Sequence, residues 1–290
     1  MSSLMHTTLI QLPELLALQS SKTPVVLLDT QFDLTSPDAG EKKYEQAHIP
    51  GSHYAHLERD LSGPKHDASG RFRGRHPLPN RDSFATTVAL WGITPNTQVV
   101  VLDDQAAMFA ARAWWMLRWL GHEAVAVLDG GLAAWRDAGQ ALSSESTPKA
   151  VNTTPYPQRP SLVGIREVED VMAQLGKRLI VDARAPERFR GEVEPLDAAA
   201  GHIPGARNRP FKDNLQADGR FKSAAVLRRE WETLLAGVRP SDVVHQCGSG
   251  ATACHNLLAL EVAGHPGGVL YPGSWSEWSS DAARPVAKGG

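Results

Sequence analysis

Short runs of apolar residues alternate with longer amphipathic segments along most of the chain. The runs at residues 25–28, 98–102 and 124–128 are rich in valine and almost free of polar side chains. Such runs are typical of strands that are buried on both faces of a parallel sheet. Residues 109–120 instead place their apolar side chains at helical spacing, so we predict a helix there. This alternation predicts an α/β fold, in which ligands bind beyond the carboxyl ends of the strands.

The two halves of the chain carry related segments in the same order. The segment HIPG occurs at residues 48–51 and again at 202–205, each time after an apolar run. The pairs that follow are Gly70 with Gly219, Gly121 with Gly264, Gly130 with Gly273, and Trp135 with Trp278. Chance does not preserve such an order, so we infer an internal repeat of about half the chain.

The repeat predicts two tandem domains, each a mainly parallel sheet flanked by helices. A polar, proline-rich stretch separates the two copies and is typical of a semi-rigid linker. We therefore predict a first domain at residues 1–143, a linker at 144–160 and a second domain at 161–290.

A cysteine lies on a short loop between the strand predicted at residues 242–245 and a helical pattern at 254–260. The loop, CGSGATA at residues 247–253, contains two glycines, so its backbone can curl until several N–H groups point at one atom. The positive end of the helix dipole adds to this field. Because these features favour a thiolate, we predict that Cys247 is a reactive nucleophile. The alternative is a small, inert core residue, which is what we expect of Cys254.

Composition narrows the class of protein. The 290 residues are 42% hydrophobic and 21% charged, which is typical of a globular protein with apolar cores. The 30 basic and 32 acidic residues nearly balance, so neither nucleic acid nor a membrane surface is an expected partner. The N-terminus lacks the pattern of a signal peptide, and no apolar stretch is long enough to span a membrane, so we expect a cytoplasmic protein. The spacing of the two cysteines fits neither a disulfide framework nor a metal site.

The CGSG-x-TA loop and the repeat together resemble the rhodanese superfamily of two-domain sulfurtransferases. The uncharged Gly248 and Ser249 are more similar to the 3-mercaptopyruvate branch than to the thiosulfate branch. The resemblance covers nearly the whole chain and implies two rhodanese-like domains. Alignment of the two copies places Asp104 opposite Cys247, so only the second domain is expected to carry the nucleophile.

The resemblance also implies a reaction. Cys247 would take a sulfane sulfur from 3-mercaptopyruvate, or alternatively from thiosulfate, and hold it as a persulfide. The sulfur would then pass to a thiol such as thioredoxin or to cyanide, without a metal or an organic cofactor. Ser249 would donate its hydroxyl to the sulfur or the donor, and Thr252 would cap the following helix. The other loop residues expected to contact the sulfur or the donor are Gly248, Gly250, Ala251, Thr252 and Ala253.

An anionic donor requires a cation. The segment DARAPERFRG at residues 182–191 resembles the D-[AS]-R-x-x-x-R-F-x-G segment of the family, which implies donor binding by Arg188. Arg184 is expected to hold this loop in shape. Mercaptopyruvate enzymes usually carry a second arginine nine residues later, where this chain has Asp197. The candidates to replace that arginine are Arg190, Arg207 and Arg209.

The first half resembles the family at two polar positions. An acidic residue ten positions after the histidine of HIPG corresponds to Glu58, and the H-x-L-P segment of the family corresponds to His76 and the three residues after it. The resemblance implies a proton relay of Glu58, His76 and Ser249 near Cys247. Without the resemblance, Glu58 and His76 are ordinary polar loop residues.

Three other classes of cysteine protein are alternatives. Tyrosine phosphatases need an arginine six residues after the cysteine, and this chain has Ala253 there. A cysteine hydrolase needs a histidine base held by a third polar group, and the 11 histidines leave that possibility open. A sulfur carrier without turnover is also compatible with the loop.

Overall fold

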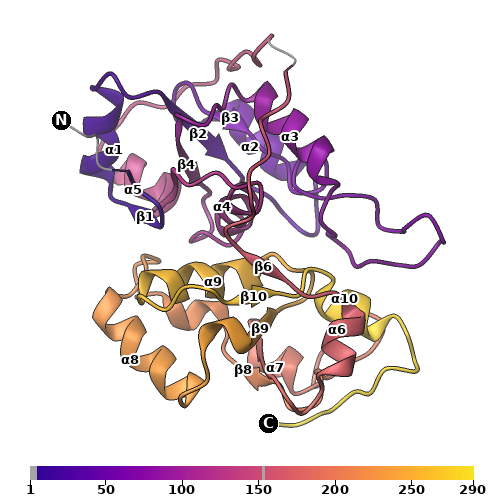
Figure 1. Ribbon diagram of the computed structural model, residues 1–290. Coiled ribbons are helices and arrows are strands. Elements are labelled where there is room, and N and C mark those ends of the chain that lie inside the picture. Colours follow the sequence, from indigo (N-terminus) through magenta and orange to yellow (C-terminus); the bar gives the residue numbers. More distant parts are fainter. Residues whose placement is uncertain (1–4, 152–153) are drawn as a thin grey trace. The chain divides into compact units, whose positions relative to one another are not determined.

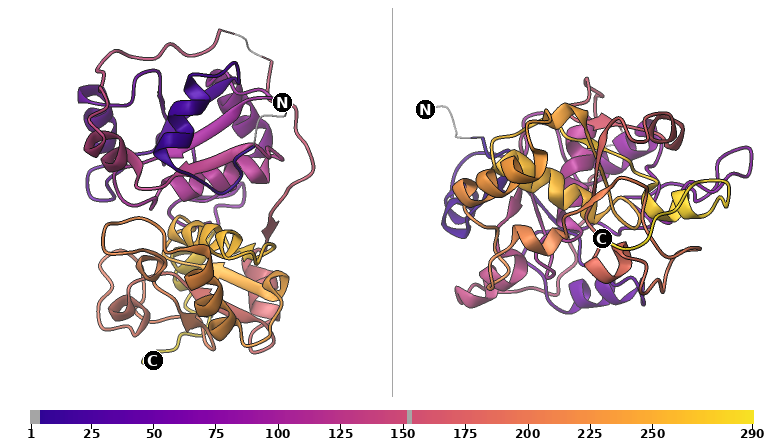
Figure 2. Two further views of the ribbon diagram at one scale, coloured as in Figure 1. Left: turned by 90° about the vertical axis from the view of Figure 1, so that its left-hand side faces the viewer. Right: turned by 90° about the horizontal axis from the view of Figure 1, so that it is seen from below.

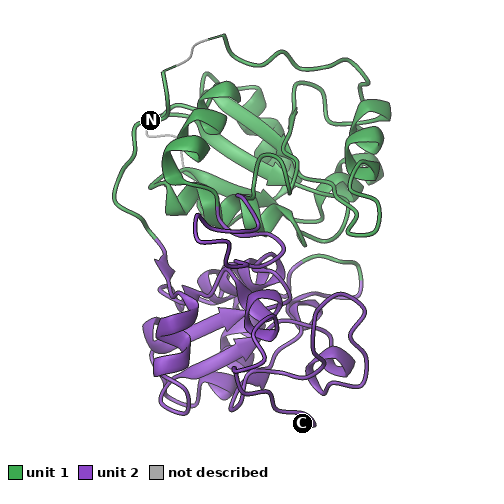
Figure 3. Cartoon of the chain, turned by 90° about the vertical axis from the view of Figure 1, so that its right-hand side faces the viewer, with its two compact units in different colours: residues 1–62, 79–162, 218–220 green, residues 63–78, 163–217, 221–290 purple. Residues whose placement is uncertain are grey.

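The computed structural model of the chain describes residues 5–151 and 154–290 (Figure 1). Contacts between residues divide it into two compact units (Figure 3). The described residues of the first unit lie within 1–62, 79–162 and 218–220, and those of the second within 63–78, 163–217 and 221–290. Residues 63–78, which we call the arm, thus come from the first half of the chain and belong to the second unit. The domain limits 1–143 and 161–290 stay a prediction. Unlike these two ranges, each unit is made of separate stretches of the chain.

The first unit contains a five-stranded sheet in the order β1-β5-β4-β2-β3, and its described pairings are parallel. The strands are β1 (Leu9–Ile10), β2 (Val25–Asp29), β3 (His53–Tyr54), β4 (Gln98–Leu102) and β5 (Val125–Leu128). The helices are α1 (Leu12–Gln19), α2 (Ala39–Gln46), α3 (Arg81–Leu90), α4 (Ala110–Trp119) and α5 (Gly131–Asp137).

The second unit repeats this topology with the strand order β6-β10-β9-β7-β8, again in parallel pairs. The strands are β6 (Gly164–Ile165), β7 (Leu179–Asp182), β8 (Arg207–Asn208), β9 (Val243–Gln246) and β10 (Val269–Leu270). The α-helices are α6 (Val168–Ala173), α7 (Pro186–Phe189), α8 (Ala224–Leu235), α9 (Thr252–Val262) and α10 (Ser274–Ser279), and the 3-10 helices are η1 (Phe211–Asn214) and η2 (Pro240–Asp242). The predicted α/β fold with two parallel sheets is confirmed.

Helices flank the sheet in each unit (Figure 2). Buried apolar side chains of the strands pack on the faces of the sheets. In the first unit Leu27 and Val100 pack with α1 and α5 in one core cluster. Their strand neighbours Val99 and Val101 point to the opposite face and are fully buried as well. Burial of each such side chain contributes roughly 1.5–3 kcal/mol. Because both faces are covered, the carboxyl ends of the strands remain as the places where a ligand can meet the sheet.

The predicted helix at residues 109–120 is confirmed as α4, whose tryptophans Trp114 and Trp115 are fully buried. These rings fill the core, as their size favours. Within the described residues, no helix has the length and apolar character needed to cross a membrane.

The arm is held to the second unit by charge and by close backbone contact. Its ion pairs join Arg71 to Glu169, Arg73 to Glu167, and Arg75 to Asp197. Gly74 has a φ of +104°, and a Cβ on it would lie 2.8 Å from the carbonyl oxygen of Gly273. Only glycine allows this conformation and this approach, so Gly74 fixes where the arm meets the segment before α10.

His245 lies on β9, two residues before Cys247, and is fully buried against the ring of Trp231. Neither ring nitrogen has a hydrogen-bond partner among the described residues. Burial lowers the pKa of His245 to about 3 from an ordinary value of 6.5. The imidazole is therefore neutral in the folded protein throughout the physiological range.

This histidine should make the protein sensitive to acid. Below pH 6.5 the unfolded chain binds a proton at His245 and the folded chain does not, so stability is lost as the pH falls from 6.5 toward 3. Between pH 7.5 and pH 5, His245→Leu should remove about 2 kcal/mol of the pH-dependent loss in unfolding free energy. Urea denaturation at the two pH values measures this difference. His66→Leu, at an exposed histidine, is the matched control, and an equal effect of both variants would contradict the assignment.

Candidate active site

Cys247 follows β9, the middle strand of the second sheet, and its side chain is buried. The N–H of Gly250 donates to its Sγ, with an N–Sγ distance of 3.1 Å. Gly250 has a φ of +79°, a left-handed conformation that lets the loop turn back on the sulfur. The site therefore presents at least one backbone donor to the sulfur, at the start of α9.

Ser274, at the start of α10, holds the backbone of Cys247. Its Oγ accepts a hydrogen bond from the N–H of Cys247 at 3.2 Å and donates to the carbonyl of Tyr271 at 2.9 Å. Its φ of +54° is unusual for a residue with a side chain. The corresponding residue of the first half is Gly131, with a φ of +53°. The second half thus keeps a strained backbone where its hydroxyl binds the N–H of Cys247. The sequence did not predict this role, although the repeat places Ser274 opposite Gly131.

The start of α9 corrects one expectation. The helix begins at Thr252, its N-cap is Ala251, and no side chain caps it, so Thr252 is the first helical residue and not the cap. The loop instead closes on the sulfur through Gly250. Cys254 is fully buried and its thiol donates to the carbonyl of Gly250 at 3.2 Å, as a packed residue can.

The alignment of the two halves also needs correction, because Asp103 and not Asp104 corresponds to Cys247. The N–H of Leu132 donates to the carbonyl of Asp103 at 2.9 Å, just as that of Trp275 donates to Cys247 at 3.0 Å. The segment between this loop and the next matched glycine is one residue longer in the first half, which shifts the offset by one.

The carboxyl group of Asp103 fills the loop of the first half. The carboxyl is buried, and each of its oxygens accepts two backbone N–H groups at 2.9 Å. The donors are Gln105 and Ala107 to Oδ1, and Phe109 and Ala110 to Oδ2. Burial raises the pKa of this carboxyl while the N–H groups lower it, and their geometry suits a carboxylate. The same loop position therefore holds a buried carboxyl group in one half and a sulfur in the other.

The arm brings the predicted histidine to the loop. His76 Nδ1 lies 2.7 Å from Ser249 Oγ, and both side chains are buried within the second unit. Glu58 belongs to the first unit, where its backbone N–H donates to His56 Nδ1 at 3.1 Å. The structure thus joins two of the three predicted relay residues, and the role of Glu58 stays a prediction.

Arg188, at the end of α7, lies beside the loop. A Cβ on Gly248 would be 3.4 Å from Arg188 Nη1. The other terminal nitrogen, Nη2, donates to Glu194 at 2.6 Å and to Asp197 at 3.0 Å. Arg184 is buried and donates to both carboxylate oxygens of Asp182, consistent with its expected role in holding this loop.

The three arginines expected as candidates for a second cation bind other partners, and their role stays a prediction. Arg190 pairs with Glu192, Arg209 pairs with Glu230, and Arg207 donates to the carbonyl of Leu234. The structure instead brings Arg75 of the arm to the site. Arg75 pairs with Asp197, and its Nη2 lies 2.8 Å from where a Cβ of Gly248 would be. Arg75 was not predicted from the sequence, although it immediately precedes His76.

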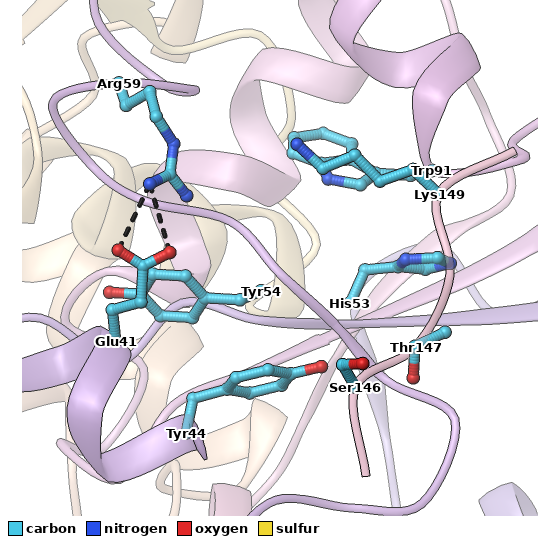
Figure 4. Close-up of a pocket in the computed structure, with 9 residues that line it drawn as sticks. All are labelled: Glu41, Tyr44, His53, Tyr54, Arg59, Trp91, Ser146, Thr147 and Lys149. Carbon is cyan, nitrogen blue, oxygen red and sulfur yellow. Dashed lines mark hydrogen bonds and ion pairs between the residues drawn. The ribbon is translucent and has the colours of Figure 1, made fainter.

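A separate cavity of about 360 Å³ lies in the first unit (Figure 4). Its charged side chains include Arg59, which donates to both carboxylate oxygens of Glu41 at 3.0 and 3.1 Å. Burial and the nearby Lys149 lower the pKa of its His53. The other lining residues are Tyr44, Tyr54, Trp91, Ser146 and Thr147. Both cysteines of the chain belong to the second unit, so this cavity lacks the predicted nucleophile.

A family model described as the rhodanese-like domain matches residues 12–138 and 166–281. The chain belongs to the rhodanese-like family. The resemblance inferred from the loop and the repeat, including two rhodanese-like domains, is therefore confirmed.

Sulfurtransferases from several organisms are similar to the chain over most of its length. The chain is 47% identical to a probable 3-mercaptopyruvate sulfurtransferase of Pseudomonas aeruginosa, over 94% of this chain and 96% of that protein. It is 41% identical to a putative thiosulfate sulfurtransferase, SseB, of Mycobacterium tuberculosis, over 97% of both. Identity to the human 3-mercaptopyruvate sulfurtransferase is 37%, over 90% of this chain and 87% of that protein.

Solved structures of sulfurtransferases have a fold similar to that of this chain. A 3-mercaptopyruvate sulfurtransferase from Leishmania major superposes with a TM-score of 0.79 at 28% identity, covering 94% of this chain and 74% of that chain. The SseA sulfotransferase of Escherichia coli superposes with a TM-score of 0.76 at 28% identity, covering 93% of this chain and all of that chain.

The strain at Ser274 gives this rhodanese-like protein a testable property. Ser274→Ala loses the hydroxyl and keeps a Cβ at positive φ, whereas Ser274→Gly loses the hydroxyl and relieves the strain. We expect Ser274→Gly to be the more stable of the two by about 1 kcal/mol in urea denaturation. At Ser279, in the same helix, the order should reverse because alanine favours a helix. The same order at both positions would contradict the strain.

Proposed function

We propose that this chain is a sulfurtransferase that moves a sulfane sulfur from 3-mercaptopyruvate to a thiol or to cyanide. The observation that carries the proposal is Cys247 in a buried loop, with a backbone N–H on its sulfur, at a position where the other half holds a carboxylate. A loop of this kind stabilises a negative sulfur without a metal or cofactor. The names of the relatives from Pseudomonas aeruginosa and human support the activity.

The first step forms the persulfide. The thiolate of Cys247 attacks the sulfur of 3-mercaptopyruvate, so an S–S bond forms and the donor's C–S bond breaks. The electron pair of that bond remains on carbon as the enolate of pyruvate. The proton of the donor thiol, now on the outer sulfur, moves to the enolate carbon and leaves pyruvate and an anionic persulfide.

The second step regenerates the thiolate of Cys247. Cyanide, or a thiolate such as that of thioredoxin, attacks the outer sulfur, and the S–S bond breaks with its electron pair on Cys247. Cyanide leaves as thiocyanate and a thiolate leaves as a persulfide. The N–H of Gly250 stabilises negative sulfur in both steps, an interaction of the kind that contributes about 3 kcal/mol. We assign donor and sulfur contacts to the remaining loop positions, namely Gly248, Ala251, Thr252 and Ala253.

Ser249 and His76 are proposed to move the proton. Their 2.7 Å contact lets the imidazole orient the hydroxyl and accept or return its proton. We propose Glu58 as a third member on the family resemblance alone. Arg188 is proposed to bind the anionic end of the donor, because its Nη1 faces the residue that follows the nucleophile.

A second candidate is thiosulfate as donor. The relative from Mycobacterium tuberculosis named as a putative thiosulfate sulfurtransferase favours it. The uncharged Gly248 and Ser249 argue for 3-mercaptopyruvate, because thiosulfate is a dianion that needs strong countercharge. We further propose that residues 1–143 form a domain that is non-catalytic apart from the relay residues His76 and Glu58. We also propose that the protein acts in the cytoplasm, without nucleic acid or membrane as partner.

Detection of an added sulfur on Cys247 by peptide mass spectrometry is the decisive test. Incubation of the wild type with 3-mercaptopyruvate should add about 32 Da, one sulfur, to the peptide that contains Cys247, and thiosulfate should do so at least about tenfold more slowly. Cys247→Ser should abolish both the label and turnover with cyanide, because oxygen forms no persulfide.

Cys254→Ser is the matched control and should keep the label, because its thiol is packed against Gly250. A label on Cys254 would overturn the mechanism. A persulfide on Cys247 that passes to neither cyanide nor thiols would identify a carrier, and faster labelling by thiosulfate would reverse the choice of donor.

The relay makes a prediction about coupling. Ser249→Ala and His76→Ala should each lower kcat/KM by about 100-fold. Because the two residues act as one unit, the double variant should be no worse than the poorer single variant. Glu58→Gln is measured in the same way, alone and combined with each of these two variants. Losses that multiply between Ser249 and His76 would contradict a shared proton path, and unfolding free energies of all variants control for structural damage.

A further inference from the structure

We propose that Arg75 is a second donor-binding residue, and that a donor carboxylate binds between its guanidinium and that of Arg188. Asp197 then holds Arg75 in place. The inference rests on the proposed function for the identity of the donor, a 2-oxo acid, and on the geometry of the second unit for the site.

The two guanidinium groups meet at the residue that follows the nucleophile. A Cβ on Gly248 would lie 2.8 Å from Arg75 Nη2 and 3.4 Å from Arg188 Nη1. The space that a side chain at this position would need is thus taken by two cations from other segments. A donor whose sulfur is at Cys247 would have its far end beside this residue.

Each arginine uses one end for the protein and directs the other toward Gly248. Arg75 binds Asp197 through Nη1, and Arg188 binds Asp197 and Glu194 through Nη2. The nitrogens nearest Gly248 are Arg75 Nη2 and Arg188 Nη1, and neither takes part in these pairs. Arg188 Nε is buried without a hydrogen-bond partner among the described residues. Donors in this arrangement suit a planar carboxylate.

Accessibility and charge support the same arrangement. The acids are enclosed, with Asp197 and Glu194 side chains 2% and 3% exposed, whereas Arg75 and Arg188 are 21% and 18% exposed. Burial, followed by the charge of Arg188, lowers the pKa of Arg75. Two neighbouring guanidinium groups repel each other, and a carboxylate bound between them offsets that repulsion.

The alternative is that Arg75 only anchors the arm. Arg71 separates these roles because it lies on the same arm and pairs with Glu169, and its partner is not a residue of the site. An anchoring role predicts similar effects from Arg71→Gln and Arg75→Gln. A binding role predicts an effect of Arg75→Gln that depends on the carboxylate of the ligand.

Two alkylating probes test this without sulfur transfer. 3-Bromopyruvate has the 2-oxo acid skeleton and bromoacetone lacks the carboxylate; in each, the Cys247 sulfur forms a bond to carbon and bromide leaves. For Arg75→Gln the rate constant with 3-bromopyruvate should fall at least about tenfold, while that with bromoacetone stays within about twofold. Arg71→Gln should change neither rate. Peptide mass spectrometry assigns the adduct to Cys247, and KM for 3-mercaptopyruvate should rise in Arg75→Gln.

The outcomes separate the inference from the proposed function. Equal losses with both probes, or no loss with either, would overturn the role of Arg75. If the wild type fails to turn over 3-mercaptopyruvate but the selective loss with 3-bromopyruvate is seen, the carboxylate site stands and the proposed donor is wrong.

Discussion

A buried side-chain acceptor at the carboxyl end of the middle strand is the constraint on which both halves of this chain depend. After β4 and β9 the backbone leaves the sheet, and its N–H groups need acceptors that the strands no longer provide. In the first half Asp103 accepts four of them. In the second half Cys247 occupies the corresponding position and accepts the N–H of Gly250. One backbone arrangement therefore holds a carboxyl group in one half and, in the other, the sulfur that we propose as the nucleophile.

The loop alone cannot complete the site, because it carries no charged side chain. The arm provides the missing groups: His76 contacts Ser249, and Arg75 lies beside Gly248. Its position depends on Gly74, where any side chain would collide with the backbone before α10. The first half of the chain thus adds to the proposed site through 16 residues, 63–78, that belong to the second unit.

The sequence predicted what local patterns determine and failed where distant segments choose partners. Valine-rich runs and helical spacing were sufficient for the strands and for α4, and the glycines around Cys247 were sufficient for the loop. The alignment of the two halves rested on Gly121 and Gly264, which follow the loop. The segment before Gly121 is one residue longer than its counterpart, so Asp104 was aligned with Cys247 in place of Asp103. No local pattern indicates that Arg75 meets Asp197, since this contact depends on how the arm folds onto the second unit. The role of Ser274 was missed because a serine does not by itself indicate a positive φ. Only its counterpart in the first half, Gly131, indicates that conformation.

The sequence at Asp197 indicates the loss of a cation, but in the structure Asp197 pairs with Arg75, a cation from another segment that lies beside Gly248. Arg75 neutralises Asp197, and Arg188 is offset by Glu194, so the four side chains together carry no net charge. A thiosulfate dianion depends mainly on net positive charge, which such a site lacks. A carboxylate depends more on the direction of paired N–H groups, which two guanidinium groups fixed by buried acids provide. On this reasoning the choice between donors follows from the orientation of the cations and not from their number.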